Sequence, residues 1–123
     1  MKKVETWAIE KVIRDDSVLR TVAPGELIFA EGDPGTFMAI VMRGSVVIQR
    51  QGQVLAEIGA GSVFGEMALI DGMPRSGDAI AKTHGRLACI DEPHFKNLIR
   101  EVPDFALILM KVLVERLRGH IES

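Results

Sequence analysis

The sequence has few cysteines, no large excess of charge of one sign and no long apolar stretch. It has one cysteine, Cys89, in 123 residues, so an intrachain disulfide is excluded and stability must come from packing. Its 15 Lys and Arg nearly balance 17 Asp and Glu, which argues against a coat for nucleic acid or anionic lipid. Apolar stretches long enough for a signal peptide, or for a membrane span of about 18 residues, are also missing. We therefore expect a single cytoplasmic domain over residues 1–123, with no membrane contact.

The middle of the chain, residues 17–91, consists of short apolar runs separated by turns that contain glycine. The runs are LRTV, LIF, FMAIVM, SVVIQ, VLAEI, AIA and LACI. Runs of this length are typical of strands, and such tight turns can join only antiparallel ones. The pattern predicts a mainly β domain, built as an antiparallel sandwich, barrel or jelly roll.

Helices are expected at both ends of the chain. Apolar residues at spacings of three and four predict a short helix over residues 1–16. The stretch after the last predicted strand has no glycine before Gly119, and Pro103 divides it into two helices, 92–100 and 103–118. The second of these is apolar nearly all round, whereas a surface helix has one apolar stripe. We therefore predict that it packs against its own copy in a homodimer.

The segment GAGSVFGEMALIDGMPRSGDAIA carries the most specific chemistry. A strand-like run breaks at Gly65 into the helix-compatible sequence GEMALID, and a turn then leads to Arg75. Without a side chain on the glycine, the backbone N–H groups of Glu66, Met67 and Ala68 would open a helical turn toward solvent. Helix N-termini bind phosphate in this way. The segment therefore predicts a site for a small anion.

Side chains from the same segment would complete this anion site. Arg75 would pair with phosphate oxygens in a charge-assisted contact that can be bidentate, and the hydroxyl and N–H of Ser76 offer further donors. Glu66 would repel a phosphate that lay at the same spot. It makes sense only if it reaches past the phosphate to a donor such as a sugar hydroxyl.

The run FGEMALIDGMPRS resembles the phosphate-binding cassette of cyclic nucleotide-binding domains, as in the bacterial catabolite activator family and the regulatory subunits of cAMP-dependent kinase. The flanking runs VAPGELIFAEGDPG, MAIVMRGSVVI, LACIDEPHFKNLI and VPDFALILMKVLVERL resemble the family's other strands and its two closing helices. The similarity extends over residues 19–118, with the cassette at 63–78. It implies an antiparallel, jelly-roll-like β-roll that holds cAMP or cGMP as its ligand, with no metal and no other cofactor.

The resemblance also implies a role for each matching position. Gly65 and the amides that follow it would hold the phosphate, which Arg75 would neutralise. Glu66 would accept the ribose 2′-hydroxyl, and Ser76 would add a contact to phosphate or base. These roles agree with the chemistry expected from the residues themselves.

The base would lie between a strand and the last helix. The strand at 53–58 would form one wall for the purine. The end of the last helix, residues 118–121, falls where the family caps the base, and His120 is the candidate for that cap.

The chain departs from the family pattern in two places. After the cassette arginine and serine many members continue with Ala-Thr, whereas this chain has Gly77 and Asp78. The glycine is expected to loosen the strand, and the aspartate to add a negative charge near the phosphate that would weaken or retune binding. In the activator family a DNA-reading helix-turn-helix follows the last helix, but here only residues 119–123 remain. We therefore expect a stand-alone domain without direct DNA binding.

These patterns support one leading function and one alternative. The leading hypothesis is a non-catalytic regulatory or sensor domain that binds cAMP or cGMP and signals through its last helix to a dimer mate or an effector protein. The alternative is a degenerate member that binds no ligand and serves for dimerisation or docking. An enzyme, such as a metal-dependent barrel of the cupin type, ranks third, because no nucleophile–base pair is visible and the histidines are scattered.

Overall fold

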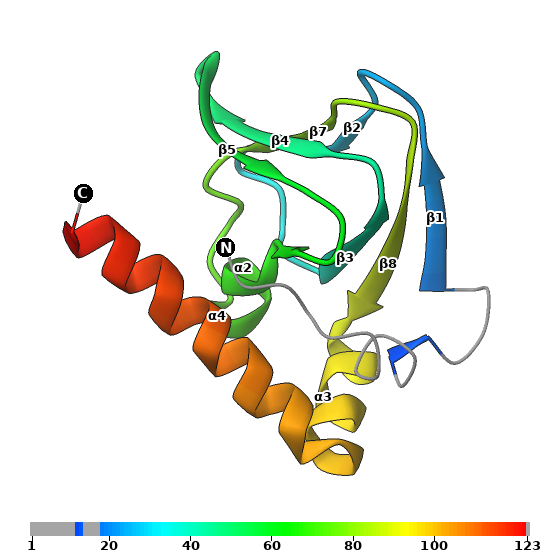
Figure 1. Cartoon of the computed structure of the whole chain (residues 1–123), viewed down its shortest axis with the longest axis vertical. Coiled ribbons are helices and arrows are strands. Elements are labelled where there is room, and N and C mark those ends of the chain that lie inside the picture. The colour runs from blue at the N-terminus through cyan, green and yellow to red at the C-terminus, as the bar shows by residue number, and fades with distance from the viewer. Residues whose placement is uncertain (1–11, 14–17, 123) are drawn as a thin grey trace.

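The computed structural model describes residues 12–13 and 18–122, with side chains as far as Gly119, and shows antiparallel strands with helices packed against them (Figure 1). The predicted helix over 1–16 lies outside the described residues, apart from Val12 and Ile13. The strands are β1 (Leu19–Val22), β2 (Leu27–Phe29), β3 (Phe37–Arg43), β4 (Val46–Arg50), β5 (Gln53–Ile58), β6 (Val63–Phe64), β7 (Asp78–Ala81) and β8 (Gly85–Asp91). The helices are α2 (Glu66–Asp71), α3 (Glu92–Glu101) and α4 (Pro103–Glu122).

The described strands form two four-stranded antiparallel sheets that together make a β-roll. One sheet has the order β1-β8-β3-β6 and the other the order β2-β7-β4-β5. Between them lies the core of the roll, made by Val22, Ile28, Ala39, Val41, Val46, Ile58, Phe64, Ala79, Ala81 and Leu87. Cys89 is half-buried beside this core, and burial raises the pKa of its thiol. The predicted fold class, mainly antiparallel β with flanking helices, is confirmed.

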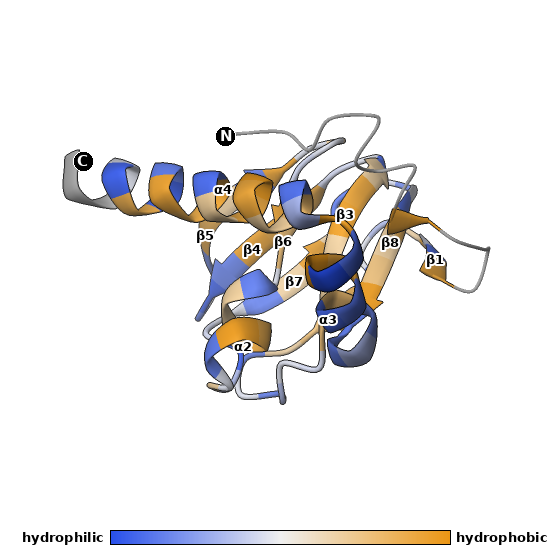
Figure 2. Ribbon diagram, turned by 90° about the horizontal axis from the view of Figure 1, so that it is seen from below, coloured by the Kyte–Doolittle hydropathy of each residue, from blue (hydrophilic) through white to orange (hydrophobic). Residues whose placement is uncertain are grey.

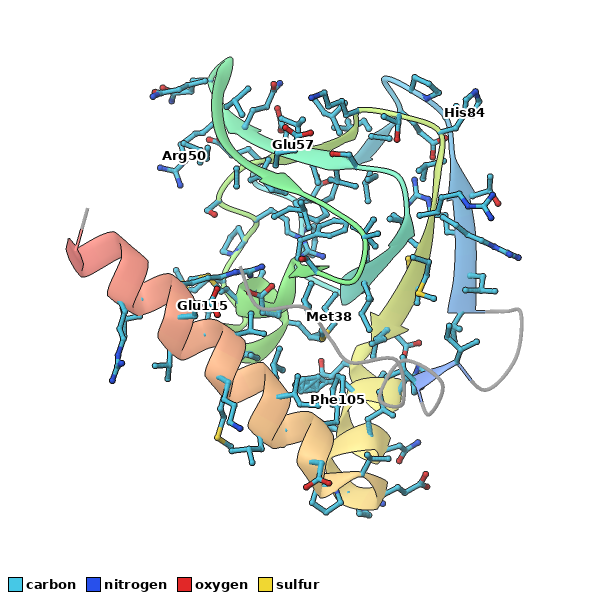
Figure 3. The ribbon with its side chains drawn as sticks, viewed as in Figure 1. Met38, Arg50, Glu57, His84, Phe105 and Glu115 are labelled. Atoms are coloured by element: carbon cyan, nitrogen blue, oxygen red, sulfur yellow. The ribbon has the colours of Figure 1, made fainter. Side chains whose placement is uncertain are left out.

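Strand β3 is buried on both faces, which explains why its sequence is a continuous apolar run. Ala39 and Val41 belong to the core of the roll, whereas Met38 and Ile40 belong to a second core on the helix side. This second core also contains Phe105 of α4, which Figure 3 shows on the side of the helix that faces Met38. The helices therefore cover the outer face of the sheet that contains β3.

The two closing helices begin and end for identifiable reasons. α3 starts directly after Asp91, whose carboxylate accepts a hydrogen bond from the backbone N–H of His94 at 3.0 Å. α4 continues to Glu122, past its predicted end, because Gly119 does not adopt the left-handed conformation by which glycine usually ends a helix. Among the described residues, no helix is both long and apolar enough to cross a membrane.

The apolar residues of α4 are divided between two faces, and Figure 2 shows apolar and polar positions alternating along the helix. One face is buried against the roll and α3 and contains Phe105, Leu109 and Val112. The other face leaves four large side chains about half exposed: Leu107, Met110, Val114 and Leu117. The roll therefore covers only part of the apolar surface of α4, as the sequence predicts, and the homodimer remains a prediction.

Candidate functional site

A cavity of about 360 Å³ lies between α2, the sheet that contains β4, and one residue of α4. Its volume is within the range of small-molecule sites, roughly 300–1,000 Å³. Much of the lining comes from the segment that follows β6, which is the predicted cassette. The lining residues are Phe29, Ile48, Ala56, Ile58, Phe64, Gly65, Glu66, Met67, Ala68, Asp71, Met73, Pro74, Arg75, Ser76, Gly77 and Arg116.

Arg75 is a buried cation in the wall of this cavity, with 4% of its surface exposed. Its Nη1 donates to the carbonyl oxygen of Gly65 at 2.7 Å, and its Nη2 donates to the carbonyl oxygen of Phe37. The guanidinium carbon lies 4.0 Å from the ring centre of Phe29, so the cation also stacks on an aromatic face. Burial lowers the pKa of Arg75 and the charge of Asp33 opposes that shift, but an arginine stays protonated in proteins.

The backbone at Gly65 allows Arg75 to approach closely. Gly65 has φ +78°, in the left-handed region that favours glycine, and an added Cβ would lie 2.9 Å from Nη1 of Arg75. A larger residue would therefore displace the guanidinium. The cassette glycine is required by the geometry of the arginine as well as by the turn.

Glu66 is the buried carboxylate that the sequence singles out, and 1% of its surface is exposed. Its Oε1 forms an ion pair with Nη1 of Arg116 on α4. Nη2 of the same arginine donates to the carbonyl oxygen of Val63, and burial lowers the pKa of Arg116. The last helix is thus tied to the cassette by one side chain.

Arg116 is the site residue that sequence reasoning missed. A signal for it is nevertheless present, because Phe105, Leu109, Val112 and Arg116 follow one another at spacings of four, three and four. These spacings place all four on one helix face, and the first three are buried. A charged residue that continues a buried stripe needs a partner of opposite charge. Here Glu66 is that partner.

Two polar atoms in the cavity wall have no hydrogen-bond partner among the described residues: Oε2 of Glu66 and Nε of Arg75. Buried polar atoms in proteins are nearly always paired. One of the two is an acceptor and the other a donor, and both belong to charged side chains that line the cavity. The site therefore offers unused bonding capacity to a molecule that carries a hydroxyl and an anionic oxygen.

The first residues of α2 line this site. The helix has a glycine in the left-handed conformation at each end, Gly65 and Gly72. Met67 and Ala68 both line the cavity. Ala68 is held against the turn before β3, because an added Cβ on Gly35 would lie 2.3 Å from the Ala68 Cβ. The structure therefore brings together the predicted cassette positions at 65–68 with Arg75.

The structure shows what surrounds Gly77 and Asp78, the two residues at which the cassette departs from the family pattern. Asp78 is not among the described lining residues, and its Oδ1 instead accepts a hydrogen bond from the backbone N–H of Glu31 at 2.7 Å. Gly77 lies close to strand β4, since an added Cβ would be 2.7 Å from the carbonyl oxygen of Gln49. Long-range neighbours, which the sequence does not reveal, thus contact both residues, and the effect of Gly77 and Asp78 on ligand binding stays a prediction. Ser76 is among the residues that line the cavity.

The side of the cavity expected to hold a base is only partly described. Ala56 and Ile58, from the strand predicted as a purine wall, line it. The side chain of His120, the predicted cap, lies outside the described residues. Within the described part of α4, Arg116 is the residue that reaches the cavity.

The fold and the cavity together define a ligand-binding β-roll. The cavity is built around one buried cation and one buried carboxylate with free bonding capacity. Within residues 12–13 and 18–122, no group of three or more His, Cys, Asp or Glu is placed to hold a metal ion.

Comparison with known proteins identifies the family. Residues 19–102 match the cyclic nucleotide-binding domain. The chain is 40% identical over 104 residues to a cyclic nucleotide-gated potassium channel of Mesorhizobium japonicum, which covers 85% of this chain and 28% of the channel. It is 36% identical over 104 residues to the cyclic AMP receptor protein of Thermus thermophilus, which covers 80% of this chain and 48% of the receptor. The crystal structure of Thermus thermophilus catabolite activator protein matches with a TM-score of 0.82 at 31% identity, over 94% of this chain and 56% of that one.

The chain belongs to the cyclic nucleotide-binding domain family, a family of regulatory rather than catalytic domains. The resemblance of the cassette to this family is thereby confirmed. The chain spans less than half the length of the two curated relatives it matches above.

Proposed function

We propose that this domain binds cAMP or cGMP in the cavity beside α2 and acts as a regulatory domain. The observation that carries the proposal is the pair of unpartnered buried atoms, Nε of Arg75 and Oε2 of Glu66, in one cavity wall. A cyclic nucleotide supplies what the two atoms lack, since its phosphate oxygens accept and its ribose 2′-hydroxyl donates. Bonds from charged groups to such partners are stronger than neutral ones.

In this proposal the phosphate lies against Arg75 and the α2 amides that begin at Glu66, where Gly65 leaves the approach open. The 2′-hydroxyl reaches Oε2 of Glu66. Ser76 adds a contact to phosphate or base, strand β5 forms one wall for the purine, and His120 caps the base. The phosphate charge is thus met by one buried cation, which suits a protein whose net charge is only −2.

The first prediction is that isothermal titration will detect binding of cAMP, cGMP or both, with a rise in melting temperature. A ligand at about 100 times its Kd stabilises the folded state by roughly 2.7 kcal/mol, which thermal unfolding can measure. Adenosine 5′-monophosphate serves as the matched control, because its open phosphate carries a second charge and extends away from the ribose. Neither heat nor a shift with millimolar cAMP or cGMP would contradict the proposed function.

We further propose that α4 carries the signal. The support is the ion pair between Arg116 of α4 and Glu66, because the carboxylate that would receive the ribose is also the one that holds the helix. A ligand shifts a conformational equilibrium only as far as it binds two states unequally. Sharing of Glu66 by ligand and helix provides such a difference in affinity.

The proposed recipient of the signal is a second copy of the chain or an effector protein, in the cytoplasm, and no DNA contact is proposed. The support for a homodimer is the exposed face of α4. Leu107, Met110, Val114 and Leu117 follow at spacings of three, four and three, which is the spacing of a two-helix seam. Two copies of this face would bury each other's apolar side chains.

The homodimer predicts a concentration-dependent sedimentation coefficient that Leu117→Gln lowers to the monomer value. Leu117 is 62% exposed, so the substitution leaves the core intact while it places an amide in the seam. Val54→Gln, at a residue 60% exposed on β5, is the matched control and should dimerise like wild type. Wild-type protein that stays monomeric at all concentrations contradicts the prediction.

A dimerisation or docking module that binds no nucleotide is the alternative function. The charge of Asp78 is one sequence feature that favours it, but this carboxylate accepts a hydrogen bond from the backbone N–H of Glu31 and is not among the described lining residues. The same sedimentation runs, repeated with cAMP and cGMP, separate the two functions. A dimer that neither nucleotide alters or binds would favour the alternative.

A further inference from the structure

The segment from Arg75 to Asp78 is held on one side by the turn between β2 and β3. The backbone N–H of Gly32 donates to the carbonyl oxygen of Arg75, and the N–H of Arg75 donates to the carbonyl oxygen of Asp33, both at 2.8 Å. The carboxylate of Asp78 adds a third bond, from the N–H of Glu31 at 2.7 Å. Three bonds thus fix this side of the segment.

The opposite side of the same segment is held by the end of β4. Nε of Arg50 donates to the carbonyl oxygen of Ser76 at 2.8 Å. Gln49 pairs with Asp78 in the β4–β7 ladder, and its carbonyl oxygen lies so close to Gly77 that an added Cβ would be 2.7 Å away. The side chain of Arg50 therefore extends the contact between β4 and the cassette beyond the last rung of the ladder.

The position of Arg50 is itself fixed by the hairpin that follows it. Arg50 pairs with Gln53, and the two residues between them, Gln51 and Gly52, have φ values of +51° and +80°. Positive φ at both positions is the signature of a type I′ turn, the tightest common hairpin connection. Arg50 lies at the end of this hairpin, on the opposite side of the molecule from His84 (Figure 3). The backbone that carries the Arg50 guanidinium is therefore fixed by a tight hairpin turn.

We propose that Arg50, Gly77 and Asp78 form a clamp that positions Arg75 and Ser76 for the ligand. The inference rests on the proposed function. Arg50 and Asp78 bond to backbone atoms from opposite sides of the segment, and Gly77 lets the two strands approach. A segment already held in its binding conformation loses less entropy when the ligand arrives. Arg50 and Asp78, which are not among the described lining residues of the cavity, therefore raise affinity without touching the ligand. Asp78 acts here as a hydrogen-bond acceptor, and its charge is incidental.

Paired substitutions test the clamp by separating hydrogen bonding from charge. Arg50→Gln keeps a nitrogen donor at the position of Nε, and Asp78→Asn keeps an oxygen acceptor, while each removes the charge. Arg50→Ala and Asp78→Ala remove bond and charge together. We expect each alanine variant to weaken cAMP and cGMP binding about 3- to 10-fold, the range for one hydrogen bond. The two amide variants should stay within about twofold of wild type.

Two further variants and the melting temperature distinguish the clamp from a general loss of charge or stability. Arg86→Ala, at an exposed residue of β8, removes one arginine far from the cassette and should bind like wild type. Gly77→Ala should weaken binding, because its Cβ forces the strands apart. The melting temperature of the unliganded alanine variants at 50 and 78 should stay near that of wild type, since both bonds are solvent-exposed. A purely structural role would instead lower it.

The possible results are distinguishable. Alanine variants that bind like wild-type protein overturn the clamp and leave the proposed function standing. Amide variants that match the alanine variants, or Asp78→Asn that binds more tightly than wild type, show that charge acts instead and also overturn it. Wild-type protein that binds neither nucleotide overturns the proposed function, and the clamp with it.

Discussion

Replacing Arg75 by alanine is expected to weaken binding of cAMP and cGMP by roughly 2–5 kcal/mol, or about 30-fold to several thousand-fold. The substitution leaves a phosphate charge unpaired in a cavity wall where the arginine is 4% exposed. It is also expected to affect both nucleotides alike, because the guanidinium would meet the phosphate and not the base. Isothermal titration of both ligands measures the loss and its independence of the base.

Controls are needed because Arg75 also supports the fold through the carbonyl oxygens of Gly65 and Phe37. Thermal unfolding of each variant shows whether the roll is intact. Arg75→Lys keeps the charge but not the planar fork, so its loss of affinity should lie between those of wild type and alanine. Arg86→Ala removes an exposed arginine and should have no effect. A folded Arg75→Ala protein with wild-type affinity would refute the assigned role.

Removing Arg116 is expected to reduce what the ribose 2′-hydroxyl contributes to binding. In wild-type protein, 2′-deoxy-cAMP should bind about 1.5–3 kcal/mol less tightly than cAMP, the range for a hydrogen bond to a charged group. Arg116 holds Oε1 of Glu66 while Oε2 is unpartnered among the described residues. Without Arg116 the carboxylate loses its fixed orientation, so Arg116→Ala should shrink the cost of the missing hydroxyl. Titration of both ligands into both proteins gives the coupling free energy between Arg116 and the 2′-hydroxyl. We expect about 0.5–3 kcal/mol, the range typical of groups that interact.

The direction of the result decides what Arg116 does. An unchanged cost for 2′-deoxy-cAMP would mean that α4 is not coupled to ribose recognition. Tighter cAMP binding by Arg116→Ala would mean that the arginine competes with the ligand for Glu66 rather than orienting it. Because the loss of Arg116 leaves a buried carboxylate without its cation, Arg116→Lys provides a second variant that keeps the charge. It should retain part of the coupling.

The sequence was sufficient where a property depends on neighbours along the chain. Strand runs, glycine turns and the closing helices were predictable, because alternation and spacing determine which residues can face a core. The cassette was predictable as well, because Gly65, Glu66 and Arg75 lie within a short segment whose order is specific. What the sequence could not predict depends on distant backbone atoms. The acceptor for Arg75 at Phe37 and the donor for Asp78 at Glu31 are peptide groups, which every residue has and which leave no trace in a sequence.

Arg116 is a different kind of miss, since its helical spacing marked it as part of a buried face. The apolar residues of α4 predict an interface, and Arg116 continues the buried stripe of the same helix. A charge that continues a buried stripe carries more information than another apolar residue, because burial of a charge requires a specific partner. In this chain that partner is the cassette carboxylate.

The short length of α2 affects how its local stability depends on α4. A helix of six residues is far below the roughly 12–15 at which isolated helices become even marginally stable in water, so α2 does not persist by its own backbone hydrogen bonds. α2 is stabilised by the contact of Ala68 with Gly35 and by the ion pair between Glu66 and Arg116 of α4. We therefore expect detachment of α4 and unravelling of α2 to belong to a single cooperative unit of local unfolding. Hydrogen exchange at the backbone amides of Met67 and Leu69, in α2, would then report the detachment of α4.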